Sequence, residues 1–353
     1  MEYYLQKKKI IKNREMGNFT FKGLFLAGLF MVLGCLSIQA ADDDGLITKQ
    51  ITIKLEKAGT LPDKIGSTKK KQITNLKIIG EINGTDLRMI REMAGRDVNG
   101  RGTDGMLSVL DLSDAKIVEG GDYYYFNGHS DYYILTGHND CFTSNDKIGD
   151  SAFESCSGLT SITLPSGVTE IGKFAFLHCS GLTSITLPSG LTEISSSAFS
   201  GCSGLTSITL PSGVTMIFSS AFESCSGLTS IALPSGLTEI GVNAFSGCSG
   251  LTSIYVYAEK LPNMGSDVFD GCDAKKCTVY VPKGTYDDYW LSEFGYFENI
   301  VEFEATGINN VVTSNDAKEL SRYSVNGQRL SAPTKGLNIV KYSDGSVKKV
   351  AIQ

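Results

Sequence analysis

The sequence predicts a solenoid that is mostly β-structure with short helical turns, and three observations lead to this prediction. A block of 23 residues recurs five times with little change, as the segments that start at Ser151 and Ser197 show. Apolar residues keep fixed positions in every block, while the residues between them are small and polar. The apolar side chains of one block bury too little surface to offset the entropy lost on ordering it, so blocks must stack to fold.

Each fixed apolar position forms a column with one side chain per block. The most regular columns are Phe153, Phe176, Phe199, Phe222 and Phe245; Leu159, Leu182, Leu205, Leu228 and Leu251; and Ile162, Ile185, Ile208, Ile231 and Ile254. Leu164 follows Ile162 by two residues, which predicts a strand over Leu159–Leu164 that Pro165 ends. Val168 and Ile171 predict a return segment, and the Ala-Phe pair before each Cys predicts one helical turn.

These repeats resemble the BspA-like leucine-rich repeat family of exported bacterial proteins. The order Ala-Phe, Cys, Leu, Ile, Leu-Pro and Ile between Ile148 and Pro262 carries the resemblance. It implies a right-handed leucine-rich-repeat solenoid with parallel strands on its concave side. It also implies surface association and adhesion to host or bacterial macromolecules.

We predict five segments along the chain. They are an export signal (1–40), an N-terminal cap with degenerate repeats and a Tyr-rich insert (41–147), five leucine-rich repeats (148–262), a degenerate repeat with a C-terminal cap (263–304), and a β-hairpin tail (305–353). The tail resembles short C-terminal tails of secreted Bacteroidetes proteins, some of which act as sorting signals.

The N-terminal segment indicates export. A basic cluster from Lys7 to Arg14 precedes an uncharged run whose strongly apolar part, Leu24–Leu36, is shorter than the roughly 20 residues that span a bilayer. We therefore favour a signal peptide over a transmembrane helix. Cleavage after Ala40 is one expectation, and lipidation of Cys35 in a lipobox-like sequence is the alternative. Met16 is an alternative start that leaves a single basic residue in front of the apolar run.

The remainder of the chain is acidic, which argues against a nucleic-acid partner. Residues 1–40 hold six Lys or Arg and two Glu, so the rest carries a net charge of −10 against −6 for the whole chain. No basic stripe of the kind that binds phosphate backbones is visible there. A membrane is expected as a partner only through a lipid anchor or a sorting tail.

Two segments look like caps. The sequence TDLRMIREMAGR has Leu87, Ile90 and Met93 at helical spacing, with Thr85 or Asp86 as the expected N-cap. Degenerate strand signatures flank this helix. They are Ile73, Leu76 and Ile78 before it, and Leu107, Leu110, Leu112, Ala115 and Ile117 after it.

At the other end, an amphipathic helix is expected to cover the last coil. Its apolar residues are Tyr286, Tyr289, Trp290 and Phe294. In the tail, Asn326-Gly327 and Asp344-Gly345 predict two hairpin turns.

The cysteines form a ladder that we interpret as buried free thiols. Its members are Cys156, Cys179, Cys202, Cys225 and Cys248, continued by Cys272. Equivalent positions on stacked coils lie about 4.8 Å apart with parallel side chains, whereas a disulfide needs Cβ atoms about 3.8 Å apart. Cys272 and Cys277 could still pair, and Cys141 has no assigned role.

No catalytic, metal or cofactor site is predicted. The three histidines, His129, His138 and His178, are not teamed with a nucleophile and a carboxylate, so we expect no enzyme. A column of Glu170, Glu193 and Glu239 is interrupted by Met216, and we interpret it as a solvated edge rather than a cation site.

The candidate ligand-binding residues lie on the outward strand face and in the Tyr-rich insert. They are Ser161, Thr163, Ser184, Thr186, Ser207, Thr209, Ser230, Ser253, Tyr255 and Tyr257 on the strands, and Tyr123, Tyr124, Tyr125, Tyr132 and Tyr133 in the insert. Exposed tyrosines favour recognition, although packing over the first coil is the alternative. The predicted function is an adhesin-like module that binds a protein on a host or neighbouring cell. The alternative is a glycan-binding module that uses the Ser/Thr face and the insert.

Overall fold

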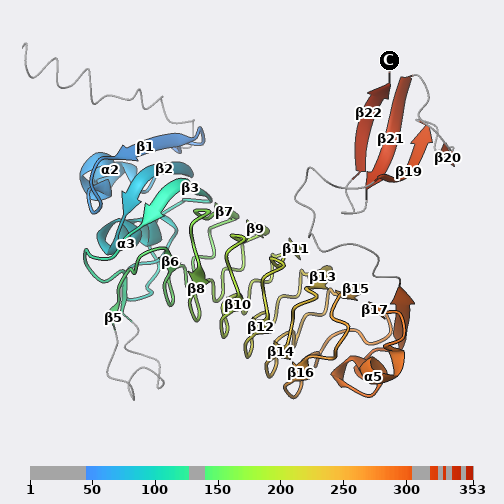
Figure 1. Ribbon diagram of the computed structural model, residues 1–353. Coiled ribbons are helices and arrows are strands. Elements are labelled where there is room, and N and C mark those ends of the chain that lie inside the picture. The colour runs from blue at the N-terminus through green and yellow to red at the C-terminus, as the bar shows by residue number, and fades with distance from the viewer. Residues whose placement is uncertain are drawn as a thin grey trace, which may run out of the picture.

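The computed structural model is a solenoid whose coils stack side by side (Figure 1). It describes residues 45–126 and 140–303, and the backbone of the strands within 319–352. Residues 1–44, which hold the predicted export signal and Cys35, lie outside the described residues. Within the described part, no helix has the length and apolar character needed to cross a membrane.

One long sheet of ten strands runs the length of the solenoid. Its order is β1 (Ile51–Leu55), β2 (Asn75–Ile82), β3 (Val109–Ile117), β7 (Ser161–Thr163), β9 (Ser184–Thr186), β11 (Ser207–Ile208), β13 (Ser230–Leu233), β15 (Ser253–Val256), β17 (Thr278–Pro282) and β18 (Asn299–Phe303). Every neighbouring pair is parallel. The degenerate strand signatures at Leu76 and Leu110 therefore continue the sheet of the repeats.

The repeat strands are shorter than expected. β7 covers three residues rather than Leu159–Leu164. The Leu159 amide donates to the Cys156 carbonyl in a turn (3.1 Å), so it is not available for the sheet. Proline at 165 has no amide to extend the strand beyond Leu164.

The return segment forms a second set of parallel strands. They are β6 (Lys147–Ile148) paired with β8 (Glu170–Ile171), and a four-stranded sheet of β10 (Glu193–Ile194), β12 (Met216–Ile217), β14 (Glu239–Ile240) and β16 (Asn263–Met264). Each of these strands has two residues. The apolar pair Val168 and Ile171 is buried here, as the pattern predicts.

The predicted helical turn before each Cys is wrong. The segment is a run of tight turns in which amides alternate between a carbonyl of their own coil and one of the next coil. In the first coil, Ala152 N donates to Gly149 O (3.3 Å) and Phe153 N donates to Ala175 O (2.7 Å). Two residues per coil have positive φ, for example Ser151 (55°) and Ser155 (59°). These left-handed residues prevent a continuous helix.

The phenylalanine column forms the centre of the core. Phe153, Phe176, Phe199, Phe222, Phe245 and Phe269 stack with ring centroids 5.3–5.8 Å apart and planes within 13°. Each of these rings is at least 99% buried. Because each ring after Phe153 lies between the rings of two neighbouring segments, burial is shared between coils, as a solenoid requires.

The cysteine ladder consists of free, buried thiols. From Cys179 onward, each Sγ of the ladder donates to the phenylalanine carbonyl of the preceding coil, as in Cys179 to Phe153 O (3.0 Å) and Cys225 to Phe199 O (3.1 Å). Cys272 and Cys277 are also free, so the possible pairing of these two is wrong. Cys141, on β5 (Asp140–Cys141), is free and half-buried.

The buried thiols should be inert towards alkylating reagents in the native protein. Burial raises the pKa of Cys225 and of Cys141 to about 12, so the thiolate fraction stays small between pH 7 and 9 (roughly the range in which a free thiol ionises). Iodoacetamide labelling mapped by mass spectrometry should therefore stay flat over this range at the eight described cysteines. Rapid labelling that rises with pH at Cys225, as for an unfolded control, would contradict the assignment.

A close approach between coils explains the glycine after each Cys-Ser pair. A Cβ on Gly204 would lie 2.5 Å from Ser180 O of the preceding coil, whereas a Cβ on Gly158 of the first coil would have no atom nearer than Ala94 O at 3.6 Å. Gly204→Ala should therefore lower the free energy of unfolding by about 1–3 kcal/mol through overpacking. Gly158→Ala is the matched control and should change it by less than about 1 kcal/mol. Equal losses in urea denaturation would show that propensity, not the close approach, governs both sites.

The N-terminal cap is built from β1, β2 and two helices, α2 (Leu61–Lys69) and α3 (Gly84–Met93). Asn83, not Thr85 or Asp86, is the N-cap of α3, and Asp86 completes the capping box from position N3. The buried Asp86 carboxylate also accepts from the amide of Leu61 (2.9 Å), which ties the start of α2 to α3. Neither β1 nor α2 has a repeat signature, and the sequence analysis missed both.

Side chains of the cap replace a missing coil. In the repeats, the carbonyls of Lys173, Ala175 and Leu177 accept from amides of the preceding coil. The equivalent carbonyls of the first coil belong to Asp150, Ala152 and Glu154, for which no preceding repeat supplies amides. Tyr124 Oη donates to Asp150 O (2.8 Å), while Arg91 donates from Nη1 to Ala152 O (3.0 Å) and from Nη2 to Glu154 O (3.4 Å). The cap thus continues the hydrogen-bond ladder with two side chains.

The C-terminal cap is one short helix followed by a 3-10 turn. α5 (Tyr286–Trp290) ends before Phe294, which lies in the 3-10 helix Glu293–Tyr296. The continuous amphipathic helix predicted for this segment is therefore wrong. Tyr289 and Phe294 are buried, and Phe294 contacts Phe269 (5.1 Å) at the end of the phenylalanine column. Trp290 is exposed and stacks on Tyr286 instead of on the last coil.

The tail contains a four-stranded antiparallel sheet in the order β20-β19-β21-β22. Its strands are β19 (Glu319–Ser324), β20 (Arg329–Leu330), β21 (Gly336–Tyr342) and β22 (Val347–Ile352). The two predicted hairpins correspond to the β19–β20 and β21–β22 pairs, and β19 pairs with β21 to join them. The turn residues themselves lie outside the described residues.

Candidate ligand-binding face

The outward face of the ten-stranded sheet carries two hydroxyl columns in register. Ser161 pairs with Ser184, Ser184 with Ser207, and Ser207 with Ser230. Residues two positions later form the second column, of Thr163, Thr186 and Thr209, which are all exposed. The isoleucine between the two columns points inward and is buried in every coil. This alternation places the candidate hydroxyls on the solvent side, as period-two patterning predicts.

The serines of the first column range from half-buried, as Ser161 and Ser230 are, to exposed, as Ser184 and Ser207 are. A neighbouring threonine column is used structurally: Thr183 Oγ1 donates to Thr160 O (3.0 Å) and Thr229 Oγ1 donates to Thr206 O (3.2 Å). By contrast, the hydroxyls of Ser184, Thr186 and Thr209 donate to no other described residue. These groups are available to a ligand.

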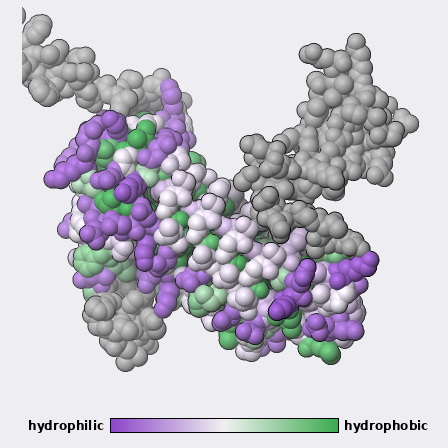
Figure 2. All heavy atoms as spheres, in the orientation of Figure 1, coloured by the Kyte–Doolittle hydropathy of each residue, from purple (hydrophilic) through white to green (hydrophobic). Residues whose placement is uncertain are grey.

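Charge is confined to the N-terminal end of this face. Lys77 on β2 lies between Asp111 (3.0 Å) and Asp114 (2.7 Å) on β3. Hydrogen bonds to Asp114 and then Asp111 raise the pKa of Lys77. Strands β7, β9, β11, β13 and β15 of this sheet hold no charged residue. In the view of Figure 2, purple side chains gather over the N-terminal elements and pale residues cover the middle repeats.

The C-terminal end of the face is aromatic. Tyr255 on β15 is the register partner of Tyr280 on β17, and their rings stack with centroids 4.6 Å apart and planes 7° apart. Tyr255 is 36% exposed. Burial, followed by the neighbouring Tyr280, raises the pKa of Tyr255. Tyr257 is half-buried and its ring meets Phe303 edge-on (5.5 Å).

The Tyr-rich insert is divided between packing and surface. Tyr124 and Tyr125 are buried, so their place among the ligand-binding candidates is corrected, and the packing alternative applies to them. The Tyr125 ring lies under the Arg91 guanidinium (4.4 Å), and its hydroxyl donates to Glu154 Oε1 (3.1 Å). Tyr123 is half-exposed against Arg88 (5.5 Å). Tyr132 and Tyr133 lie outside the described residues.

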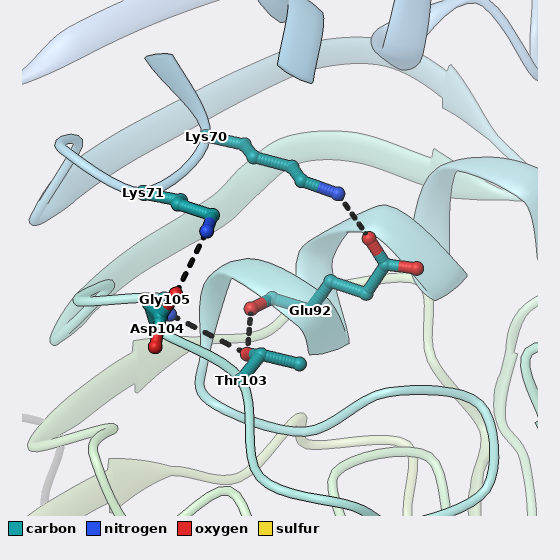
Figure 3. A network of polar contacts seen from close by, with 6 residues as sticks. All are labelled: Lys70, Lys71, Glu92, Thr103, Asp104 and Gly105. Carbon is teal, nitrogen blue, oxygen red and sulfur yellow. Dashed lines mark hydrogen bonds and ion pairs between the residues drawn. The ribbon is translucent and has the colours of Figure 1, made fainter. Parts of the chain in front are cut away.

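A separate pocket, which the sequence analysis did not predict, lies in the N-terminal cap (Figure 3). Lys70 pairs with Glu92 (2.5 Å) and Lys71 with Asp104 (2.7 Å). Thr103 Oγ1 donates to Glu92 O (2.6 Å) and closes one side. Because each lysine has its own carboxylate, the pocket offers no surplus charge to an ionic ligand.

The carboxylates and histidine of the repeats form no site. Glu170 pairs with Lys147 (2.5 Å), and Met216 is the register partner of both Glu193 and Glu239. His178 is exposed. Over residues 45–126 and 140–303, no three or more His, Cys, Asp or Glu side chains are grouped to hold a metal ion.

Stacked coils that each add one strand to a long parallel sheet, together with a buried leucine column and a solvent-facing side of that sheet, define a leucine-rich-repeat solenoid. Residues 146–276 match the family model of the BspA type leucine rich repeat region, in six copies. This part of the chain is a BspA-type leucine-rich repeat region, so the resemblance seen in the sequence is confirmed. No curated protein matches the chain.

Several solved structures are similar to the chain. A leucine rich repeat protein of T. pallidum is 31% identical, with 38% of this chain and 66% of that chain covered and a TM-score of 0.31. A leucine rich cell surface protein of Faecalibacterium prausnitzii is 22% identical (60% and 50% covered, TM-score 0.30). A leucine-rich repeat protein of Bacteroides ovatus is 24% identical (47% and 61% covered, TM-score 0.28). The chain thus spans between half and two-thirds of the length of these proteins.

Proposed function

We propose that this chain is an exported, non-catalytic module that binds a macromolecule of a host or neighbouring cell on the outward face of its ten-stranded sheet. The in-register, uncharged face from β7 to β15, which ends in the exposed Tyr255–Tyr280 pair, carries the proposal. Solenoids use such extended faces for binding. Aromatic residues are enriched among the groups that dominate binding energies.

A protein is the ligand class that the leucine-rich-repeat family favours, which makes the module adhesin-like. The purified chain should retain one or more extracellular-matrix proteins in a pull-down, and Tyr255→Ala should weaken this retention at least tenfold. Tyr286→Ala is the matched control, because Tyr286 is similarly exposed but lies on α5, outside the strands of the sheet. Binding to a glycan array with no retained protein would overturn the protein-ligand proposal.

A glycan is the second candidate ligand. The specific observation in its favour is that the face combines neutral hydroxyl columns with an aromatic ring and has no charged side chain from β7 to β15. Hydroxyl groups of a saccharide can both donate to and accept from such columns.

Export itself is part of the proposal and depends on residues 1–40. Protease digestion of intact expressing cells should remove the chain if it is displayed on the surface. Cys35→Ala separates the two processing routes: it should release the chain from membranes if Cys35 is lipidated, and leave it unchanged if cleavage follows Ala40. Full protection from protease together with retention in the cytoplasm would overturn the proposal of export.

A further inference from the structure

The threonine column of the binding face is interrupted at one position, next to the first exposed aromatic ring. The column contains Thr163, Thr186 and Thr209, but β13 has Ala232 in its place. Ala232 is the register partner of Tyr255 on β15. An alanine therefore lies beside the tyrosine, where every preceding repeat has a threonine.

The geometry of the tyrosine pair shows which ring face is left open. The 4.6 Å between the Tyr255 and Tyr280 centroids is close to the spacing of neighbouring strands, and the rings are nearly parallel. The rings therefore stack along the direction that runs from strand to strand. One face of Tyr255 is covered by Tyr280, and the other is turned towards β13, where Ala232 has no atom beyond Cβ.

The space above Ala232 is wide enough for one six-membered ring. Its walls are the Tyr255 ring on β15 and the side chain of Thr209, which directly follows β11. Strands β11 and β15 are two strand spacings, about 9.6 Å, apart. A ring in contact with both walls needs about 7–8 Å, two contacts of about 3.5–4.0 Å. Ser230, on the same strand as Ala232 and the same face, adds a hydroxyl at one side. A threonine at 232 would place its methyl and hydroxyl groups in this space.

We infer that this notch, defined by Thr209, Ser230, Ala232 and Tyr255, binds one neutral pyranose ring of a glycan. The C–H groups on one face of the sugar lie against the electron-rich face of Tyr255. The sugar hydroxyls replace the water that Thr209 and Ser230 lose on binding. An apolar side chain of a protein ligand would leave those hydroxyls unpaired, at a cost of about 1–3 kcal/mol each.

Charge supports the same ligand class. No Lys or Arg lies on strands β11, β13 or β15, so a nucleotide or another phosphate-bearing ring would find no cation there. A neutral sugar requires none. The inference rests on the proposed function only in that the same face does the binding.

The test uses the purified chain and the methyl glycosides of β-galactose, β-glucose and α-mannose. Saturation-transfer NMR should show transfer to the ring C–H protons of at least one glycoside. Ala232→Thr fills the notch with the residue that three other coils already have, so it should keep the fold and weaken binding at least tenfold. Tyr255→Thr should do the same by removing the ring. Val242→Thr is the control, since Val242 lies in the same block of 23 residues as Ala232 but outside the sheet and is exposed, and this variant should bind as the unchanged chain does.

The outcomes separate this inference from the proposed function. Thermal unfolding followed by circular dichroism checks that each variant is folded. The inference that the notch binds a sugar is overturned by either of two results. One is undiminished glycoside binding by folded Ala232→Thr, and the other is the absence of saturation transfer to all three glycosides. If matrix proteins are still retained in that case, the proposed function stands without it. If neither glycosides nor proteins bind, both fall.

Discussion

Replacing Arg91 with methionine should lower the free energy of unfolding by about 3–5 kcal/mol, the loss typical of removing one partner from a buried charged network. Arg91 is fully buried and donates to the carbonyls of Ser151 (2.7 Å), Ala152 and Glu154. Methionine fills a similar volume but donates nothing, so the carbonyls of Ala152 and Glu154 lose their donor under the cap, while Ser151 O keeps the bond from the Glu154 amide (3.1 Å). Each unpaired buried group costs about 1–3 kcal/mol.

The burial of the guanidinium is itself costly, because Arg91 Nε has no hydrogen-bond partner among the described residues. The predicted loss in the free energy of unfolding therefore comes mainly from carbonyls that lose their donor, and not from a strong net attraction between these carbonyls and the arginine. Urea denaturation gives the free energy, and hydrogen exchange should show faster exchange first at α3 and the first coil. Arg88→Met is the control, since Arg88 lies on the same helix, is half-exposed and has its guanidinium 5.5 Å from the centre of the Tyr123 ring. A loss as small as that of the control would show that the cap does not depend on these hydrogen bonds.

The sequence predicted the solenoid because repetition makes its apolar columns visible without any structure. Phe222 and Cys225 recur at one spacing in every coil, so their shared burial follows from stacking alone. The hairpin pairs of the tail followed from local turn chemistry. The five-part division of the chain stays a prediction, as do the roles assigned to residues 1–40.

Features that depend on a single coil or on distant residues could not be predicted in the same way. The left-handed residues that replace the expected helical turn are mostly not glycines, as Ser151, Phe174 and Asn243 show. Arg91 donates hydrogen bonds to residues 60 or more positions away in the sequence. The sequence nevertheless contained a sign that this arginine is buried. Arg91 follows Leu87 by four residues, which places a charge on the apolar face of the helix. A charged residue on a face that is otherwise apolar indicates that the charge has a hydrogen-bonding partner in the interior.

The candidate site was predicted in part. In the sequence, Ala232 and Tyr255 stand where the first three repeats have threonine, and period-two patterning places both positions on the outward face. The sequence did not show that these two residues are register partners or that the Tyr255 ring is stacked from one side only. The surface that such a break in the threonine column creates depends on which residues of the neighbouring strands lie beside it, and this is known only once the register of the coils is known.

Replacing Phe222 with alanine should lower the free energy of unfolding by about 3–5 kcal/mol, the loss typical of a buried aromatic ring. Phe222 lies between Phe199 (5.5 Å) and Phe245 (5.3 Å), and all three rings are fully buried. The cavity left by the missing ring faces both neighbours, so the interfaces on both sides are weakened. In a solenoid the coupling between coils passes through such interfaces.

The unfolding of Phe222→Ala should therefore separate into two transitions, with the coils before and after the substitution unfolding at different urea concentrations. Circular dichroism combined with hydrogen exchange of the Leu182 and Leu251 regions can assign each transition to one side. Phe142→Ala is the control, because Phe142 is 53% exposed and belongs to no column, and it should leave the transition within about 0.5 kcal/mol of the unchanged chain. If Phe222→Ala instead unfolds in one transition with a loss below about 1 kcal/mol, the phenylalanine column is not what couples the coils, and the coupling must reside in the backbone ladders.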